Sequence, residues 1–252
     1  MTGNRIPNKK NMYIIIAIIL AYLIGSIPNA VWIGKVFYGK DVRKEGSNNA
    51  GATNVIRVLG LKPGIVVLVL DLLKGIIPLF LFFNFVQVSW TFGIGLLQWM
   101  YVAIAVATVL GHVFPIFAGF RGGKGVATLV GVLIALYFFE FPIVATVFFG
   151  MLFLFRYVSL ASICAAISLP ITHFVMLWYW FMNLDHSWVV EYLGMDLADY
   201  NPTFLSYVLG NSPLLIFAIL IAIFVPLTHI KNIKRLLHKE EPKFVFRKHS
   251  TE

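Results

Sequence analysis

The sequence predicts an all-α integral membrane protein with seven transmembrane helices. Hydrophobic residues make up 60% of the 252 residues and charged residues only 12%, which is too little polar surface for a water-soluble protein of this size. A spanning helix takes about 20 mostly apolar residues, and runs of this kind recur along the chain. The basic residues behind the formal charge of +9 flank these runs, which predicts contact with membrane lipids and no nucleic-acid partner.

Seven apolar runs define the predicted spans, and they make residues 1–252 a single polytopic membrane domain. The runs cover residues 12–33, 65–83, 88–110, 126–139, 141–155, 158–182 and 213–228. The first is long enough to span and is followed by no cleavage site, so we interpret it as a retained helix rather than a signal peptide. The fourth and fifth are short, so one long helix over 126–155 is the alternative to two separate spans.

Charge decides between these two topologies. With seven spans, one side of the membrane holds sixteen of the twenty Lys and Arg residues, and the other holds five acidic residues and no basic one. The basic side consists of 34–64, 111–125, the turn at Arg156 and the tail from residue 229. The acidic side consists of 84–87, the turn at Glu140 and 183–212.

The positive-inside rule makes the basic side cytoplasmic, so the N-terminus lies outside and the C-terminus is cytoplasmic. Joining the fourth and fifth runs would place the basic tail outside and reverse the rule. Three basic residues near the N-terminus, Arg5, Lys9 and Lys10, are exceptions that the remaining charges outweigh.

The single cysteine, Cys164, lies inside an apolar run, which excludes an internal disulfide and argues against a thiolate metal cluster. The outer segment 183–212 carries aromatic residues suited to the membrane interface, and we assign no chemistry to it.

The first cytoplasmic segment with the composition of a phosphate site is 40–62. Small residues expose backbone donors, hydroxyls and amides donate to oxygen, and arginine holds phosphate in a bidentate manner. The candidates for substrate or phosphate binding are Ser47, Asn49, Gly51, Thr53 and Asn54, with Arg57 as a candidate catalytic residue. The alternative is a polar turn with an Asn or Thr helix cap, although the run is long for a turn.

The second segment, 111–125, is a glycine-rich loop with two basic residues between two apolar runs. Gly122 and Gly123 would let backbone N–H groups approach an anion, and Lys124 supplies the opposite charge. The loop also leads into a predicted helix N-terminus at Val126, which favours negative charge. The alternative is a cytoplasmic turn whose basic residues only follow the topology rule. His112, at the membrane edge, is more typical of an interfacial hydrogen-bonding group than of a base.

The third segment, 229–244, places His229 and Asn232 three residues apart, on one face of a helix if the segment is helical. Both are candidate catalytic residues. The alternative is a basic juxtamembrane helix that binds anionic lipid headgroups.

Asp71 and Lys74 lie three apart inside the second predicted span, where unpaired charges are costly. Pairing with each other is one interpretation. A role in supporting the cytoplasmic loops from beneath is the other, because helix side chains lean toward the N-terminal end, which is cytoplasmic here.

Three phosphate-suited segments on one membrane face predict a shared anionic site at the cytosolic interface. A transporter would place its polar groups near the midplane, in broken helices. This distribution favours an interfacial enzyme or a headgroup binder over a channel.

These residues resemble the acyl-phosphate:glycerol-3-phosphate acyltransferase family (PlsY) of bacterial membranes, in family order and across nearly the whole chain. The matching motifs are 25–28, 46–57, 71–75, 111–128, 156–162 and 229–244. The run 111–128 and the Gly51-Ala52-Thr53-Asn54 core are the most specific.

The resemblance implies seven helices, a multi-pass location in the bacterial plasma (inner) membrane, and an active site facing the cytoplasm. It also implies acyl transfer from acyl phosphate to the 1-hydroxyl of glycerol 3-phosphate, giving lysophosphatidic acid and phosphate. The polar motif positions associated with the active site are matched by Ser47, Thr53, Asn54, Arg57, Lys124, His229 and Asn232. Either Ser159 or Ser162, in the turn between the fifth and sixth runs, joins them as a candidate. The resemblance further implies no metal, no cofactor and no acyl-CoA donor, although the sequence itself does not exclude acyl-CoA.

The chain departs from the family pattern at two glycine positions. Asn48 stands where the family has the second glycine of Gly-Ser-Gly-Asn, and Lys239 stands where the tail has glycine. Asn adopts left-handed backbone more readily than most residues, so we expect the first loop to survive.

The expected mechanism is direct transfer, because no serine-nucleophile signature is present. Arg57 and Lys124 would hold the phosphates, and His229 would either orient the acceptor or act as general base. A substrate phosphate oxygen is the other candidate for the proton. Two further functions stay open at this point: a non-enzymatic transporter of phosphorylated solute or lipid, and a scaffold that binds anionic lipid.

Overall fold

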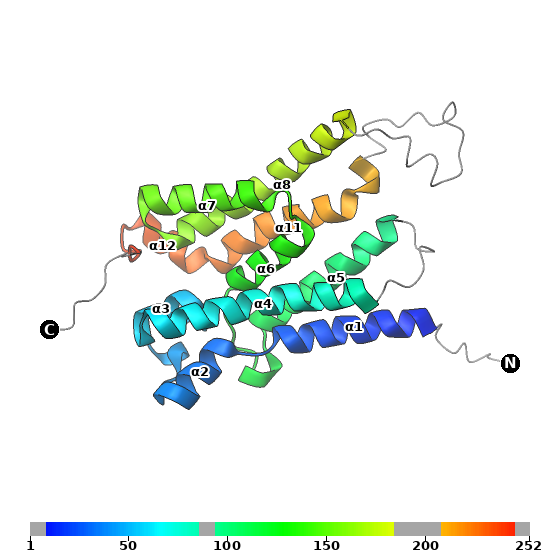
Figure 1. Cartoon of the computed structure of the whole chain (residues 1–252). Coiled ribbons are helices and arrows are strands. Elements are labelled where there is room, and N and C mark those ends of the chain that lie inside the picture. The colour runs from blue at the N-terminus through cyan, green and yellow to red at the C-terminus, as the bar shows by residue number, and fades with distance from the viewer. Residues whose placement is uncertain (1–8, 86–93, 184–207, 245–252) are drawn as a thin grey trace, which may run out of the picture. The chain divides into compact units, whose positions relative to one another are not determined.

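The structure, a computed structural model, describes residues 9–85, 94–183 and 208–244 (Figure 1). All regular secondary structure in those ranges is helical. The chain divides into two compact units, Met1–Phe138 and Phe139–Glu252. Residue Arg5, segment 86–87 and most of the predicted outer segment 183–212 lie outside the described residues.

The first unit contains most of the predicted site residues, which lie in the loop segments 40–62 and 111–125. Its helices are α1 (Lys9–Gly25), α2 (Asn29–Tyr38), α3 (Ala52–Leu59), α4 (Leu61–Phe85), α5 (Ile94–Val113) and α6 (Val126–Leu136), with short 3-10 turns η1 (Val42–Lys44) and η2 (Ile116–Ala118). Helix α4 contacts α3, α5 and α6, and α1 packs along α5 (Figure 1).

The first predicted run, 12–33, is interrupted in the structure. Helix α1 ends at Gly25 and α2 begins at Asn29, with Pro28 between them at φ −91° and ψ 68°. Proline has no N–H to continue the helical ladder, which is why the chain turns here. The turn brings the Ile27 carbonyl and the Asn29 side chain against α4, where they bond to Lys74 and Asp71.

Glycines allow the helices of this unit to approach closely, as in other membrane proteins. A Cβ on Gly75 of α4 would overlap the carbonyl of Thr128 in α6, and one on Gly131 of α6 would overlap the carbonyl of Leu72. This contact fixes α6, and the loop that precedes it, against the polar part of α4.

The second unit is built from α7 (Phe141–Phe155), α8 (Val158–Asn183), α11 (Ser212–Thr228) and α12 (Ile230–Leu237). Helix α8 packs against both α7 and α11. Helices α11 and α12 meet at a bend of 60°, and His229 lies at that bend. The tail returns to the start of α8, where the N–H of Phe244 donates to the carbonyl of Arg156 at 2.6 Å.

Four described helical segments are long and apolar enough to cross a membrane: Met12–Tyr38, Leu61–Phe83, Leu97–Ala118 and Val158–Asn183. The bent pair α11 and α12 is a fifth candidate, and α6 and α7 are apolar but shorter. The alternative of one long helix over 126–155 is wrong, because α6 ends at Leu136 and α7 begins at Phe141.

Candidate functional site

Asn54 organises the first predicted loop. Its side-chain amide is buried and donates to the carbonyls of Val42 (2.7 Å), Glu45 (3.1 Å) and Asn49 (3.1 Å), while its oxygen accepts from the N–H of Ser47 (2.8 Å). These backbone contacts use the hydrogen-bonding capacity of the amide. The structure therefore gives Asn54 a positioning role, which the sequence interpretation of a direct phosphate ligand did not foresee.

Helix α3 presents two other predicted residues to the outside. Thr53 and Arg57 are exposed and four residues apart, so they share a face, whereas Asn54 and Val55 point inward. The Cδ atom of Arg57 would lie 3.4 Å from a Cβ on Gly46, so the arginine side chain runs beside the loop that carries Ser47. Gly51, just before α3, has nothing within 4 Å of its would-be Cβ.

Both family departures adopt the backbone that a glycine would supply. Asn48 has φ 56° and Lys239 has φ 58°, in the left-handed region that side chains rarely occupy. Asn48 therefore adopts the left-handed backbone on which the expectation for this loop rests. Lys239 is the more strained of the two, since long side chains enter this region less readily than Asn.

The glycine-rich loop makes backbone contacts with the end of α5. The N–H of Gly122 donates to the carbonyl of Val113 (3.1 Å), and that of Gly123 donates to the carbonyl of His112 (3.3 Å). These two N–H groups therefore cap the end of α5 in this structure. The predicted helix start at Val126 is confirmed, and half-buried Lys124 lies just before it.

Close packing explains why glycine occupies both positions. A Cβ on Gly122 would overlap the carbonyl of His112, and one on Gly123 would overlap the His112 ring and lie 2.9 Å from the carbonyl of Ala50. Gly123 is therefore held between α5 and the first loop segment. The fold brings segments 40–62 and 111–125 together at this contact.

Arg43 makes a second connection between the two segments. It forms an ion pair with Asp41 (2.8 Å) and donates to the carbonyl of Ala118 (2.8 Å). The hydrogen bond from Arg43 holds the pKa of Asp41 well below its usual range, and the same bond raises the pKa of Arg43. Sequence reasoning missed this role, although an Asp two residues from an Arg at a turn is a readable signal.

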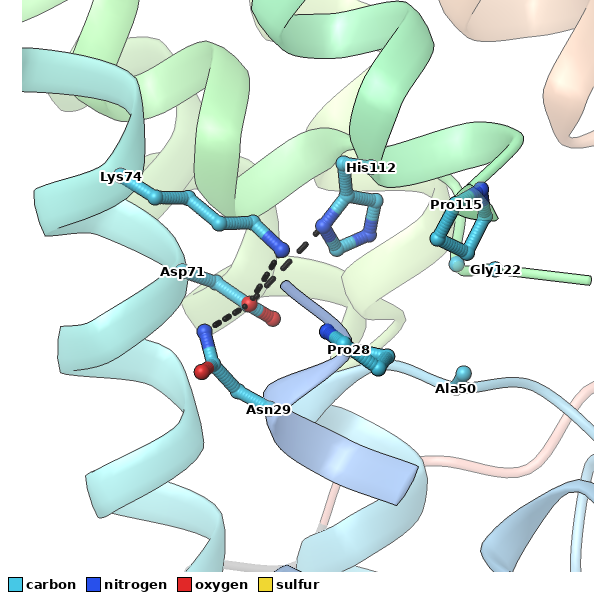
Figure 2. A pocket seen from close by; sticks show the side chains of 9 residues that line it. Pro28, Asn29, Ala50, Asp71, Lys74, His112, Pro115 and Gly122 are labelled. Atoms are coloured by element: carbon cyan, nitrogen blue, oxygen red, sulfur yellow. Dashed lines mark hydrogen bonds and ion pairs between the residues drawn. The ribbon is translucent and has the colours of Figure 1, made fainter. Parts of the chain in front are cut away.

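Asp71 and Lys74 form an ion pair at 2.9 Å, which confirms the pairing interpretation. They line a small cavity with Asn29, His112 and the backbone of Ala50, Gly122 and Gly123 (Figure 2). The pair thus lies directly against both loop segments.

In the second unit, His229 is buried at the bend between α11 and α12. Its Nδ1 lies 2.8 Å from the carbonyl of Val225. Because a carbonyl only accepts, Nδ1 carries the proton, and Nε2 is the proton-accepting nitrogen of the neutral ring. This tautomer suits either role predicted for His229.

Glu241 connects the other predicted residues of this unit. It accepts from Asn232 (2.6 Å), Arg235 (2.7 Å) and Ser159 (2.8 Å). Burial raises the pKa of Glu241, but the hydrogen bonds from these three donors outweigh that effect and lower the pKa below its usual value. Sequence reasoning missed Glu241, and its only signal was an acidic side chain within a strongly basic tail.

The predicted site residues fall into two groups. The first unit holds Ser47, Asn49, Gly51, Thr53, Asn54, Arg57, Gly122, Gly123 and Lys124. The second unit holds Ser159, His229 and Asn232, with Ser159 and Asn232 joined through Glu241.

The fold and these contacts define a class: a multi-helix protein with helices long and apolar enough to cross a membrane and with polar loops at the helix ends. A family model for glycerol-3-phosphate acyltransferase matches residues 15–239, and the chain belongs to that family. The resemblance read from the sequence is confirmed.

Individual relatives agree along almost the full length. A glycerol-3-phosphate acyltransferase of Endomicrobium trichonymphae is 40% identical, over 93% of this chain and 98% of the relative. One of Chlorobium limicola is 36% identical, over 92% and 96%. The crystal structure of PlsY, an integral membrane glycerol 3-phosphate acyltransferase, in its glycerol 3-phosphate form has a TM-score of 0.69 at 36% identity, covering 92% of this chain and 96% of that one. Its lysophosphatidic acid form has a TM-score of 0.65.

Proposed function

We propose that this membrane acyltransferase transfers a fatty acyl group from acyl phosphate to the 1-hydroxyl of glycerol 3-phosphate, giving lysophosphatidic acid and phosphate in phospholipid synthesis. The observation that carries the proposal is full-length similarity to an enzyme solved with glycerol 3-phosphate and with lysophosphatidic acid. The ordered loop around Asn54 and the exposed Thr53 and Arg57 provide phosphate-binding groups in this chain. The transporter and scaffold interpretations are not favoured, because neither accounts for this family membership.

The chemistry needs no covalent enzyme intermediate. The acceptor hydroxyl oxygen attacks the acyl carbonyl carbon, and the bond from that carbon to the phosphate oxygen breaks with the electron pair leaving on phosphate. Arg57 and Lys124 hold the two phosphate groups, with Ser47, Asn49, Gly51 and Thr53 around them. Because phosphate leaves readily, positioning and charge stabilisation supply most of the rate.

The activity is tested with purified protein supplied with palmitoyl phosphate and glycerol 3-phosphate, following phosphate and lysophosphatidic acid together. Equal amounts of both products are expected. A parallel reaction with palmitoyl-CoA identifies the donor, and we expect no product from it. Folded protein that forms product with neither donor would refute the proposal.

His229 is proposed to take the hydroxyl proton on Nε2, because Nδ1 already donates to Val225. His229→Ala is expected to lower kcat by about 100-fold or more, within the usual range for losing a general base. The matched control is His238→Ala, since His238 makes the same kind of contact to Lys234 (2.8 Å) but is exposed. If His229→Ala retains near-normal kcat at saturating substrate, a substrate phosphate takes the proton instead.

The topology is part of the same proposal. With seven spans, of which α6 and α7 are two short ones, the N-terminus lies outside. The segments 40–62, 111–125 and 229–244 then lie in the cytoplasm, so the active site is at the cytoplasmic face of the bacterial plasma membrane. The distribution of Lys and Arg supports it. A cysteine introduced at Lys243 in a Cys164→Ser background should react with an impermeant maleimide only after cells are opened. Labelling in intact cells would reverse the orientation.

A further inference from the structure

A cluster of polar side chains is buried in the first unit beneath the two loop segments. Asp71 is 1% exposed, Lys74 5% and His112 6%. The Asp71 carboxylate oxygen Oδ1 accepts from Lys74 Nζ (2.9 Å) and from Asn29 Nδ2 (2.9 Å), and His112 Nδ1 lies 3.8 Å away (Figure 2). Residues of helices α2, α4 and α5 therefore converge on one carboxylate.

Stability alone does not account for such a cluster. Charges inside a membrane are costly, and apolar residues of similar volume often stabilise a buried site as well as an ion pair does. Intramembrane ionisable residues therefore point to function. Unlike apolar contacts, the hydrogen bonds of an ion pair are directional, so they fix the relative positions of the helices whose side chains form the pair.

Each member of the cluster is connected to a different part of the loop region. Lys74 Nζ donates to the carbonyl of Ile27 (2.9 Å), which ties α4 to the turn before α2. The His112 ring is held at Nδ1 by the Thr128 hydroxyl (3.1 Å). The other side of that ring faces Gly123, where an added Cβ would overlap His112 Nε2 and lie 2.9 Å from the carbonyl oxygen of Ala50.

The His112 ring thus separates the buried charges from the glycine loop. Figure 2 shows Asp71, Lys74 and His112 pointing toward one another, with Ala50 and Gly122 at the edge of the same cavity. A change in ring position would move Gly123 against Ala50, and with it Lys124 relative to the first loop.

We propose that Asp71, Lys74 and His112 are positioning residues that set the spacing between the segment at Ala50 and the loop 122–124, and so determine the affinity for glycerol 3-phosphate. This inference rests on the proposed function, because the two segments carry its phosphate-binding groups. The cluster does not touch substrate and takes no part in the proton transfer.

The test measures KM for glycerol 3-phosphate, kcat and thermal stability for Asp71→Asn and for His112→Asn. Both variants are expected to raise KM about tenfold, corresponding to about 1.4 kcal/mol, while kcat changes less than threefold. The double variant Asp71→Asn with Lys74→Gln removes both charges, so it should recover stability relative to Asp71→Asn without recovering KM.

A matched control is available in the second unit, where Glu140 and His173 form another buried pair at 2.7 Å. Glu140→Gln should lower stability and leave KM unchanged. If the cluster variants behave like Glu140→Gln, with lower stability and unaltered KM, their role is structural only and the inference is wrong.

Calorimetric binding of glycerol 3-phosphate separates this inference from the proposed function. Wild-type protein that binds glycerol 3-phosphate without acylating it would refute the function, and the Kd of the variants would still decide the role of the cluster. Wild-type protein that neither binds nor acylates glycerol 3-phosphate would overturn both.

Discussion

Replacing Glu241 by Gln is expected to lower kcat/KM by about 100-fold, which equals about 2.7 kcal/mol. The carboxylate accepts from Asn232, Arg235 and Ser159, at 2.6, 2.7 and 2.8 Å. Gln has a single acceptor oxygen and brings two N–H donors toward groups that themselves donate. Asn232 would lose its orientation, and hydrogen bonds to a charged group contribute about 1.5–3 kcal/mol each.

The neighbouring residue supplies the control. Glu240 is exposed and bears the same charge, so Glu240→Gln should retain full activity. Equal activity of the two variants would show that Glu241 does not position Asn232. Steady-state kinetics with both substrates, together with melting curves to confirm folding, distinguish a displaced Asn232 from an unfolded tail.

The lowered pKa of Glu241 also sets the sign of a pH effect. A carboxyl whose pKa is lower in the folded protein contributes stability that is present above its unfolded pKa, about 4.3, and is lost as pH falls through the folded value. This contribution should disappear in the Glu241→Gln variant, whose melting temperature is expected to depend less on pH below about 4.3.

The pattern of apolar runs along the sequence was sufficient to predict the bounds of several helices. The ends of α7 match the predicted run 141–155, and α6 begins at the predicted Val126. Apolar length and helix-stop residues act locally, so they can be read from one sequence. The break at Pro28 was also marked by a local signal, but the apolar character on both sides concealed it.

Contacts between distant residues explain what sequence reasoning missed. Asn54 was expected to face a phosphate because its residue type suits that role, and only the fold shows its amide enclosed by Val42, Glu45 and Asn49. Glu241 bonds Ser159 across 82 positions of sequence, a distance over which no periodicity or spacing rule applies.

The glycine loop illustrates the same point at one position. Glycine at position 123 was expected to permit the close approach of an anion. The structure shows that the close neighbours of Gly123 are the His112 ring and the carbonyl of Ala50. A substitution here therefore tests packing between the two loop segments rather than loss of a backbone donor.

Gly123→Ala is expected to abolish most of the activity, with kcat/KM lowered by about 100-fold or more. The added methyl group would overlap the His112 ring and crowd the carbonyl of Ala50. Backbone yields less easily than a flexible side chain, so the loop must move, and a displacement of about 1 Å in a positioned group can cost about 100-fold in rate. Because Lys124 follows directly, its ammonium group moves with the loop.

The comparison variant is Gly131→Ala, where the new methyl group would overlap the carbonyl of Leu72 in the α4–α6 contact. Its steric conflict is as severe but lies between two helices, so it should lower the melting temperature with a smaller effect on KM. The double variant Gly123→Ala with His112→Ala makes room for the methyl group and should recover part of the lost activity. Without such recovery, the His112 ring is not what confines Gly123, and the close packing of the loop against Ala50 alone explains the need for glycine.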